Sequence, residues 1–376
     1  MNLTPHNELI WVDQRPQFRR MIADLMRHPL LAVDTESNSL FVYREQVCLI
    51  QFSTGEKDYL LDTLALDNLS ELDELFASPK YEKIFHAAEY DLLCLHRDFG
   101  FIFSNIYDTM IAGRILGKPE IGLAAMIEGE FGIHLDKRYQ RANWGKRPLP
   151  PEQLEYARLD TFYLMPLRER TMAALKESGR WELAQEDFRR QCIVELSAEN
   201  NASPCWKVAG NNDLSPQQIA VLDELCQMRD QKARQANIPV FKVLSNNALL
   251  QIAQDLPRTL EELNSLRCLS GSEIARYGES LLQVVERGLS REPLRRPFNH
   301  HRPDERYVVR LEALRGWRKR TGAEQGVPSD VILPRSVLEQ IAQLNPKSEV
   351  ELQPIMADLP WRYQRYKADI LKVRQS

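Results

Sequence analysis

The pattern of apolar and polar residues in the first hundred positions alternates between helix and strand. Apolar residues at helical spacing predict a helix at 17–27, and short apolar runs predict strands at 30–33, 47–52, 59–61 and 84–85. A polar stretch at 53–58 separates two of these runs and predicts a hairpin. Helical patterns then dominate residues 87–197. We therefore expect an α/β domain with a mixed sheet over residues 1–203.

Turn-forming residues crowd positions 200–213, so we interpret this stretch as a linker. Beyond it the strand signals vanish. Ser215 followed by Pro216 is typical of the start of a helix, with a capping serine and a proline in the first turn. We expect two all-helical domains, at 213–292 and 304–376.

An internal repeat with an offset of 89 residues supports this division. The matched positions are Ile238-Pro239 with Val327-Pro328, Leu249-x-Gln251-Ile252-Ala253-Gln254 with Leu338-x-Gln340-Ile341-Ala342-Gln343, and Leu222, Leu225 and Arg229 with Leu311, Leu314 and Arg318. Such identity at core and turn positions predicts two copies of one helical module. The stretch 292–303, which holds three prolines, joins them.

Composition narrows the class of protein. Hydrophobic residues make up 43% and charged residues 27% of the 376 positions, as in soluble folded proteins. No run approaches the roughly 20 apolar residues of a membrane helix, and residues 1–13 lack an apolar secretory core, so we expect a cytoplasmic protein with no membrane segment. Six scattered cysteines without a C-x-x-C pair argue against a zinc or dithiol site.

Charge is distributed unevenly along the chain. Residues 1–200 hold 23 Lys and Arg against 32 Asp and Glu, a net charge of −9, whereas residues 201–376 hold 26 against 21, a net charge of +5. This asymmetry predicts cation binding in the first half and polyanion binding in the second.

Three short segments place acidic residues next to predicted elements. Asp34 and Glu36 end a strand at i and i+2, so their carboxylates share a face, where a divalent cation would relieve their repulsion. Asp91 lies near the start of a helix, where the helix dipole alone would favour it. Tyr156 and Asp160 lie one helical turn apart. Taken singly, each segment also has an ordinary structural explanation, such as solvated acids at a strand end.

Taken together, the order, spacing and flanking residues of these segments resemble the three exonuclease motifs of the DEDD superfamily, in its tyrosine-bearing branch. The resemblance implies a catalytic set of Asp34, Glu36, Asp91, Tyr156 and Asp160. Its four carboxylates would hold two divalent cations, Mg²⁺ or Mn²⁺, one activating water and the other stabilising the leaving 3′ oxygen. Tyr156 would position the attacking water, because an ordinary phenol is a poor base at neutral pH.

Further segments extend the resemblance over nearly the full chain. Residues 47–52 and 107–112 resemble those around the site in the ribonuclease D family, and the helical modules resemble HRDC domains, here in two copies. This implies a ribonuclease H-like exonuclease domain followed by two HRDC-like bundles. It also implies a 3′–5′ exoribonuclease that releases nucleoside 5′-monophosphates and trims tRNA precursors and other small structured RNAs.

The stretch 137–147 holds five basic residues and two aromatic residues but no acid, which suits single-stranded nucleic acid. A solvated loop with one structural tryptophan is the alternative. We expect substrate contacts from the following residues: Gln51, His86, Lys137, Arg138, Arg141 and Trp144. His86 could instead secure the end of its strand.

A second basic run, 287–320, carries 11 basic residues against four acids. It is either a groove for RNA phosphates or two ordinary solvated helix faces. The sequence contains no Ser-His-Asp pattern and no glycine-rich phosphate loop, so we expect neither an acyl hydrolase nor a nucleotide cofactor.

Two other functions stay open at this point. One is a DNA 3′ exonuclease of the same superfamily, which matched RNA and DNA oligonucleotides would distinguish. The other is a nucleic-acid-binding protein with an inactive nuclease domain, which a Mg²⁺-dependent degradation assay would distinguish.

Overall fold

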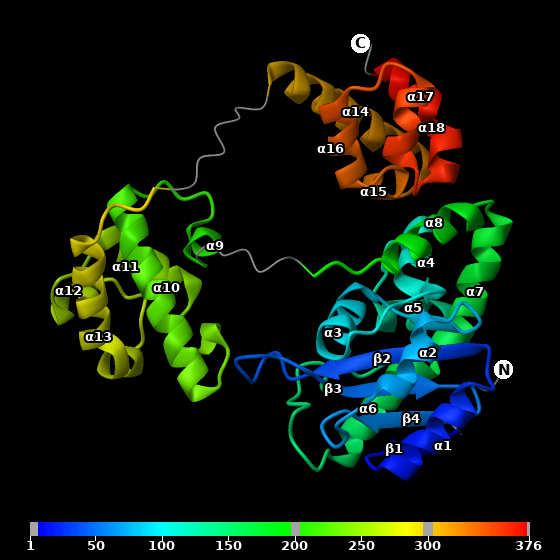
Figure 1. The fold of residues 1–376 in the computed structure, drawn as a ribbon, viewed down its shortest axis with the longest axis horizontal. Helices are drawn as coiled ribbons and strands as arrows, with labels where there is room; N and C mark the ends of the chain where they lie inside the picture. The colour runs from blue at the N-terminus through cyan, green and yellow to red at the C-terminus, as the bar shows by residue number, and fades with distance from the viewer. Residues whose placement is uncertain (1–6, 197–203, 296–303, 374–376) are drawn as a thin grey trace. The chain divides into compact units, whose positions relative to one another are not determined.

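The computed structural model describes residues 7–196, 204–295 and 304–373 (Figure 1). They form two compact units, one drawn from residues 7–37, 47–196 and 304–373 and the other from 38–46 and 204–295. The strands, all in the first unit, are β1 (Glu8–Val12), β2 (Leu30–Ser37), β3 (Val47–Ser53), β4 (Lys57–Asp62), β5 (Glu82–Phe85) and β6 (Ile106–Asp108). The helices of the first unit are α1 (Arg15–Leu25), η1 (Ser70–Leu72), α2 (Asp73–Ala77), α3 (Glu89–Phe99), α4 (Thr109–Ile115), α5 (Leu123–Phe131), α6 (Pro151–Phe162), α7 (Leu164–Glu177), α8 (Trp181–Gln191), α14 (Glu305–Gln325), α15 (Ser329–Ile332), α16 (Arg335–Leu344), α17 (Glu349–Leu352), η3 (Gln353–Met356) and α18 (Pro360–Val373). The helices of the second unit are α9 (Cys205–Ala209), α10 (Pro216–Ala236), η2 (Val240–Lys242), α11 (Asn246–Asp255), α12 (Leu260–Ser265) and α13 (Gly271–Ser290).

The six strands form one mixed sheet in the order β1-β4-β3-β2-β5-β6. β3 and β4 are antiparallel neighbours, which confirms the predicted hairpin, and β2 pairs antiparallel with β3 but parallel with β5. The sequence pattern missed β1 and β6. β1 shows no clear alternation of buried and exposed residues, and β6 is only three residues long, too short for a periodic signal.

Helices cover both faces of this sheet. Leu31 and Val33 of β2 enter the core formed with α1, α2 and α3, whereas Ala32 enters the core formed with α4, α7 and α8. Because side chains alternate along a strand, Asp34 and Glu36 share the face of Ala32. α6 packs on the sheet over β2, β3 and β4. The acids that end β2 therefore point toward the helix side that carries α6.

The predicted linker at 200–213 is wrong in part. Residues 197–203 lie outside the described part of the chain, but Cys205–Ala209 form helix α9. Cys205 and Ala209 are buried in the core of the second unit. The turn-forming residues on both sides concealed a short amphipathic helix that belongs to the first helical module, residues 204–295.

The structure confirms the internal repeat. α10 and α14, α11 and α16, and α13 and α18 each begin 89 residues apart. Arg229 donates from Nη1 to the carbonyl of Leu244 (3.1 Å), and Arg318 makes the corresponding bond to Leu333 (3.0 Å). The second helical module, residues 304–373, thus repeats the first in helices and in at least one internal hydrogen bond.

The second module packs within the first unit through a buried ion pair. Arg362 of α18 bonds Glu186 of α8 (Nη1–Oε2, 2.9 Å) and Asp187 (Nη2–Oδ2, 2.8 Å). The side chains of Arg362 and Glu186 are fully buried, and Glu186 also accepts the backbone N–H groups of Trp361 and Arg362. Removing one partner of such a pair typically costs about 3–5 kcal/mol, because it leaves an uncompensated buried charge.

No helix within the described ranges is both long enough and apolar enough to cross a membrane.

Candidate active site

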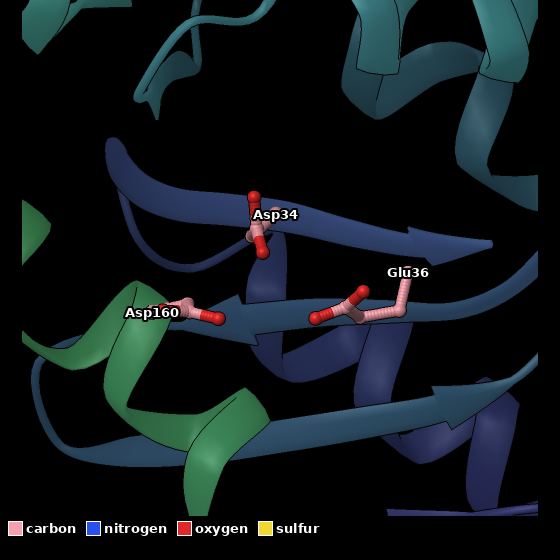
Figure 2. Close-up of side chains that lie close together, drawn as sticks. All are labelled: Asp34, Glu36 and Asp160. Atoms are coloured by element: carbon pink, nitrogen blue, oxygen red, sulfur yellow. The ribbon is translucent and has the colours of Figure 1, made fainter. Parts of the chain in front are cut away.

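Three carboxylates converge on the α6 side of the sheet. Asp34 and Glu36 come from β2 and Asp160 from the last turns of α6, and one oxygen from each lies within 4.8 Å of the others. Figure 2 shows the three side chains gathered between the helix and the strand. Two elements far apart in the sequence thus build one cluster of oxygen ligands.

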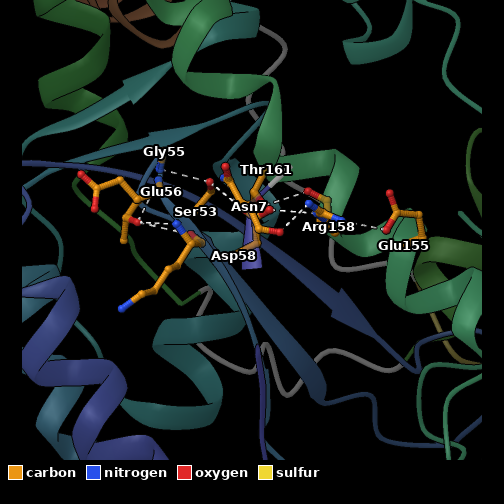
Figure 3. Close-up of polar contacts among 10 residues, drawn as sticks. Asn7, Ser53, Gly55, Glu56, Asp58, Glu155, Arg158 and Thr161 are labelled. Carbon is orange, nitrogen blue, oxygen red and sulfur yellow. Dashed lines mark hydrogen bonds and ion pairs between the residues drawn. The ribbon is translucent and has the colours of Figure 1, made fainter. Parts of the chain in front are cut away.

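A polar network fixes α6 over the sheet (Figure 3). Arg158, which lies between Tyr156 and Asp160 in sequence, donates to Asp58 of β4 (Nε–Oδ2, 2.9 Å) and to the carbonyl of Asn7 (2.8 Å). Asp58, only 1% exposed, also accepts from Ser53 Oγ (2.6 Å). The network ties the helix carrying Tyr156 and Asp160 to the strands beside β2.

Asp91 lies on α3 and joins the cluster through Thr35. The Thr35 hydroxyl donates to Asp91 Oδ1, so the residue between the two acids of β2 reaches the third predicted motif. Asp91 is not one of the three carboxylates within 4.8 Å, yet its charge raises the pKa of Asp34. Asp91 therefore belongs to the same electrostatic site.

Crowding and burial disfavour ionisation of all four acids. Burial, followed by the charges of neighbouring carboxylates, raises the pKa of Asp34 and Glu36 well above their ordinary values. Burial is also the main cause that raises the pKa of Asp91 and Asp160 to about 7, against opposing hydrogen bonds from Thr35 and Tyr156. A group of acids in this state favours any cation that can neutralise it.

Tyr156 faces the cluster from α6. Burial and the negative charge of Asp160 raise the pKa of its hydroxyl, so the hydroxyl keeps its proton at neutral pH more firmly than an exposed phenol does. Its ring packs against Tyr139 and Trp144, with centroid separations of 6.1 and 6.0 Å. The aromatic contacts hold the ring while the hydroxyl stays near the carboxylates.

A cavity of about 420 Å³ opens beside these residues. Its lining includes the three carboxylates of the cluster and Tyr156, together with His86, Leu123 and Lys137. His86 Nδ1 lies 2.9 Å from Thr109 Oγ1, and burial lowers the pKa of its imidazole. His86 is thus both anchored at the end of β5 and present at the cavity wall, as both sequence interpretations allowed.

The basic stretch 137–147 divides into exposed and anchoring residues. Lys137, Arg138 and Arg141 are exposed, although Arg138 is paired with Asp136 (2.5 Å). Arg147 bonds both oxygens of Asp62 at 2.6 Å and the carbonyl of Cys48 at 2.8 Å. This anchor holds the stretch against the sheet, and Lys137 lines the cavity.

Two predicted substrate contacts need correction. Gln51 is 0% exposed within β3, and Trp144 is 1% exposed in a small core with Leu49 and Ala157. Neither side chain has surface with which to touch RNA. Trp144 instead supports the ring of Tyr156, the structural role that the sequence left as the alternative.

Three residues that were not predicted from the sequence also build the site. Thr35 bonds Asp91, Arg158 anchors α6, and Asp108 accepts the backbone N–H groups of Ala87 (3.0 Å) and Ala88 (2.8 Å) just before α3. Asp108 lies in a segment singled out by resemblance. No sequence signal marks the partner of Arg158, because Asp58 is 100 residues away.

The second basic run contains several intramolecular contacts. Arg291 bonds Asp223 and Glu224, Arg315 bonds Glu312, and Arg310 donates to the carbonyl of Ala342. Residues 296–303 lie outside the described part of the chain. The described cations of this run are therefore partly used within the fold.

The cluster fits divalent cations on its own chemistry. It offers hard oxygen ligands, the type that Mg²⁺ and Mn²⁺ prefer, at mutual separations short enough for one ion to touch several of them. Burial first, and then repulsion between neighbouring carboxylates, raises the pKa of Asp34 and Glu36, and the charge of a bound cation would offset both.

Comparison with known proteins establishes the class. A family model described as 3′-5′ exonuclease matches residues 9–176, and one described as HRDC domain matches residues 218–285 and 309–373. The fold is thus that of a 3′–5′ exonuclease domain joined to two HRDC domains. The predicted limits at 203, 213, 292 and 304 stay a prediction.

Full-length relatives narrow the class further. Ribonuclease D of Nitrobacter hamburgensis is 30% identical over 85% of each chain, and that of Escherichia coli is 32% identical over 81% of this chain and 79% of its own. The crystal structure of the Escherichia coli enzyme, described as an exoribonuclease involved in structured RNA processing, has a TM-score of 0.70 at 26% identity and covers 98% of this chain and 99% of its own. The chain belongs to the ribonuclease D family of 3′–5′ exoribonucleases, which confirms the predicted fold class and activity.

The crowded acids predict how stability depends on pH in protein stripped of cations. The folded state holds protons on Asp91 and Asp160 up to about pH 7, whereas the unfolded chain releases them near pH 4. Their contribution to stability is therefore present at low pH and lost as the pH rises through 7. Melting of EDTA-treated protein should show a lower Tm at pH 8 than at pH 5.5, and Mg²⁺ should restore the loss at pH 8. A Tm that is independent of both pH and Mg²⁺ would contradict this.

Proposed function

We propose that this exoribonuclease hydrolyses RNA with two divalent cations, Mg²⁺ or Mn²⁺, held by Asp34, Glu36, Asp91 and Asp160. The observation that carries the proposal is the gathering of three of these carboxylates within 4.8 Å beside a cavity. Such cations supply a Lewis acid that activates water and stabilises charge on the leaving 3′ oxygen. The product would be a nucleoside 5′-monophosphate.

Each of the five predicted catalytic residues would have a distinct part in this reaction. Asp34, Glu36 and Asp160 would bind cations directly, and Asp91, held by Thr35, would complete the ligand set from α3. The Tyr156 hydroxyl keeps its proton, because its pKa is raised, so it would orient the attacking water by hydrogen bonding rather than act as a base.

The terminal nucleotide would enter the cavity past Lys137 and His86, which line it. Arg138 and Arg141, on the exposed part of the same stretch, would contact phosphates further along the strand. By analogy with the Escherichia coli relative, we propose that the substrates are structured RNAs. From the sequence, we also propose that these include tRNA precursors and that the protein acts in the cytoplasm.

Removal of single carboxylates tests the function itself. Asp34→Asn, Glu36→Gln, Asp91→Asn and Asp160→Asn should each reduce RNA degradation by at least about 100-fold, since each removes charge from the proposed ligand set. The measurement is Mg²⁺-dependent shortening of a 3′-extended RNA, with unchanged circular dichroism as the control for folding. Degradation of a matched DNA oligonucleotide would indicate a DNA 3′ exonuclease instead. A wild-type protein that degrades neither substrate would indicate a nucleic-acid-binding protein with an inactive nuclease domain.

A separate prediction concerns Tyr156→Phe. The variant should lose kcat by roughly 10- to 100-fold with little change in KM, because the ring still packs on Trp144 and only the orienting hydroxyl is lost. Steady-state kinetics on a short single-stranded RNA provide the measurement. Parallel changes in kcat and KM, or unaltered kinetics, would assign Tyr156 a different role.

The exposed cations should set affinity rather than rate. Lys137→Ala and Arg141→Ala should weaken RNA binding, and each should reduce the slope of log affinity against log salt by about 0.7, the value for one contact with a single strand. Lys80→Ala is the matched control, since Lys80 is exposed before β5, at the opposite end of that strand from His86. Binding would be measured in inactive Asp34→Asn protein. An equal effect of Lys80→Ala would indicate nonspecific attraction only.

A further inference from the structure

Gln51 has a fully buried carboxamide whose nitrogen and oxygen both lack a hydrogen-bond partner among the residues that the structure describes. It lies in the middle of β3, where it pairs with Asp34 of β2 on one side and Leu60 of β4 on the other. Leaving a buried polar group unpaired costs about 1–3 kcal/mol. Because native proteins keep few such groups, this one calls for an explanation.

The register places this carboxamide beside the acidic cluster. Residues directly opposite each other on antiparallel strands share a face, with Cβ atoms about 4.5–5.5 Å apart, so Gln51 lies next to Asp34 beneath α6. Of its other neighbours on this face within the sheet, Leu60 is apolar, and the Ser53 hydroxyl already donates to Asp58 and accepts the N–H of Gly55 (3.4 Å). The Asp34 carboxylate is therefore the polar group that Gln51 is placed to meet.

We propose that Gln51 is a positioning residue whose amide N–H donates to one oxygen of Asp34 while the other oxygen binds a cation. This inference rests on the metal site proposed above. Carboxylates that bind metals are usually held by hydrogen bonds of their own, which set their orientation and affinity. Because its backbone is fixed between two strands, the bond would form by rotation of the Gln51 side chain.

The proposal predicts that replacing Gln51 changes metal affinity without lowering the stability of the fold, whereas replacing a purely structural residue would lower both. Without a cation the amide is an unpaired buried group, so replacing it by an apolar side chain of similar size should not destabilise the protein. With a cation the same replacement removes a support of Asp34. Loss of metal affinity without loss of stability is the expected signature.

The test uses full-length Gln51→Met and Gln51→Leu, stripped with EDTA and titrated with Mn²⁺, with free Mn²⁺ followed by its EPR signal. We expect the dissociation constant for Mn²⁺ to rise about 10- to 100-fold and the metal-free Tm to equal or exceed that of wild type. RNA degradation should fall at low Mn²⁺ and recover at saturating Mn²⁺, with unchanged KM for RNA.

Leu60→Met is the matched control, because it alters packing on the other side of Gln51 without changing a polar group. Unchanged Mn²⁺ affinity in both Gln51 variants, or loss of the fold in both, would overturn the role of Gln51. Wild-type protein and Asp34→Asn isolate the underlying site. If wild type binds no Mn²⁺, or Asp34→Asn binds it equally well, the proposed metal site itself fails.

Discussion

Electrostatic repulsion among acids in a half-buried pocket is the constraint that shapes the rest of this domain. Asp34 and Glu36 are fixed by the sheet, but Asp160 depends on the placement of α6. An unanchored helix would relieve the repulsion by moving away. The buried bond from Arg158 to Asp58 opposes that movement, and its place between Tyr156 and Asp160 in the same helix fixes both the height and the rotation of the catalytic turn.

The turn between β5 and α3, which also borders the site, is likewise held in place by buried hydrogen bonds. Ala87 adopts a left-handed conformation (φ 61°) at the turn between β5 and α3, a conformation that costs free energy for a residue with a Cβ atom. Asp108 compensates by accepting the N–H groups of Ala87 and Ala88, and it also receives the side chain of Gln191 (2.7 Å). The strained turn is thereby held where it presents His86 to the cavity and starts the helix that carries Asp91.

Local sequence patterns predicted the features that depend on residues close together in the chain, and few others. The i, i+2 spacing of Asp34 and Glu36 already places both on one face of a strand, and the hairpin of β3 and β4 follows from its polar turn. The burial of Gln51 and Trp144 could not be predicted in this way. The local sequence around Gln51 in its strand, and around Trp144 in the basic stretch, is the same whether the side chain faces solvent or α6. Convergence of Asp160 with β2 came from resemblance to known motifs, since no periodicity links residues more than 120 positions apart.

The two repeated modules differ in how the first turn of their last helix is capped. In the first module Ser270 and Glu273 cap the start of α13 in a capping box. The corresponding positions in the second module, 89 residues on, are Leu359 and Arg362, so α18 has lost both capping side chains. Glu186 of α8 replaces them by accepting the first N–H groups of α18 and pairing with Arg362. The same substitution thus removes a local cap and creates a buried ion pair. A nuclease domain separated from the second module would lose these contacts and expose Glu186, so the second module covers part of α8 as well as repeating the first.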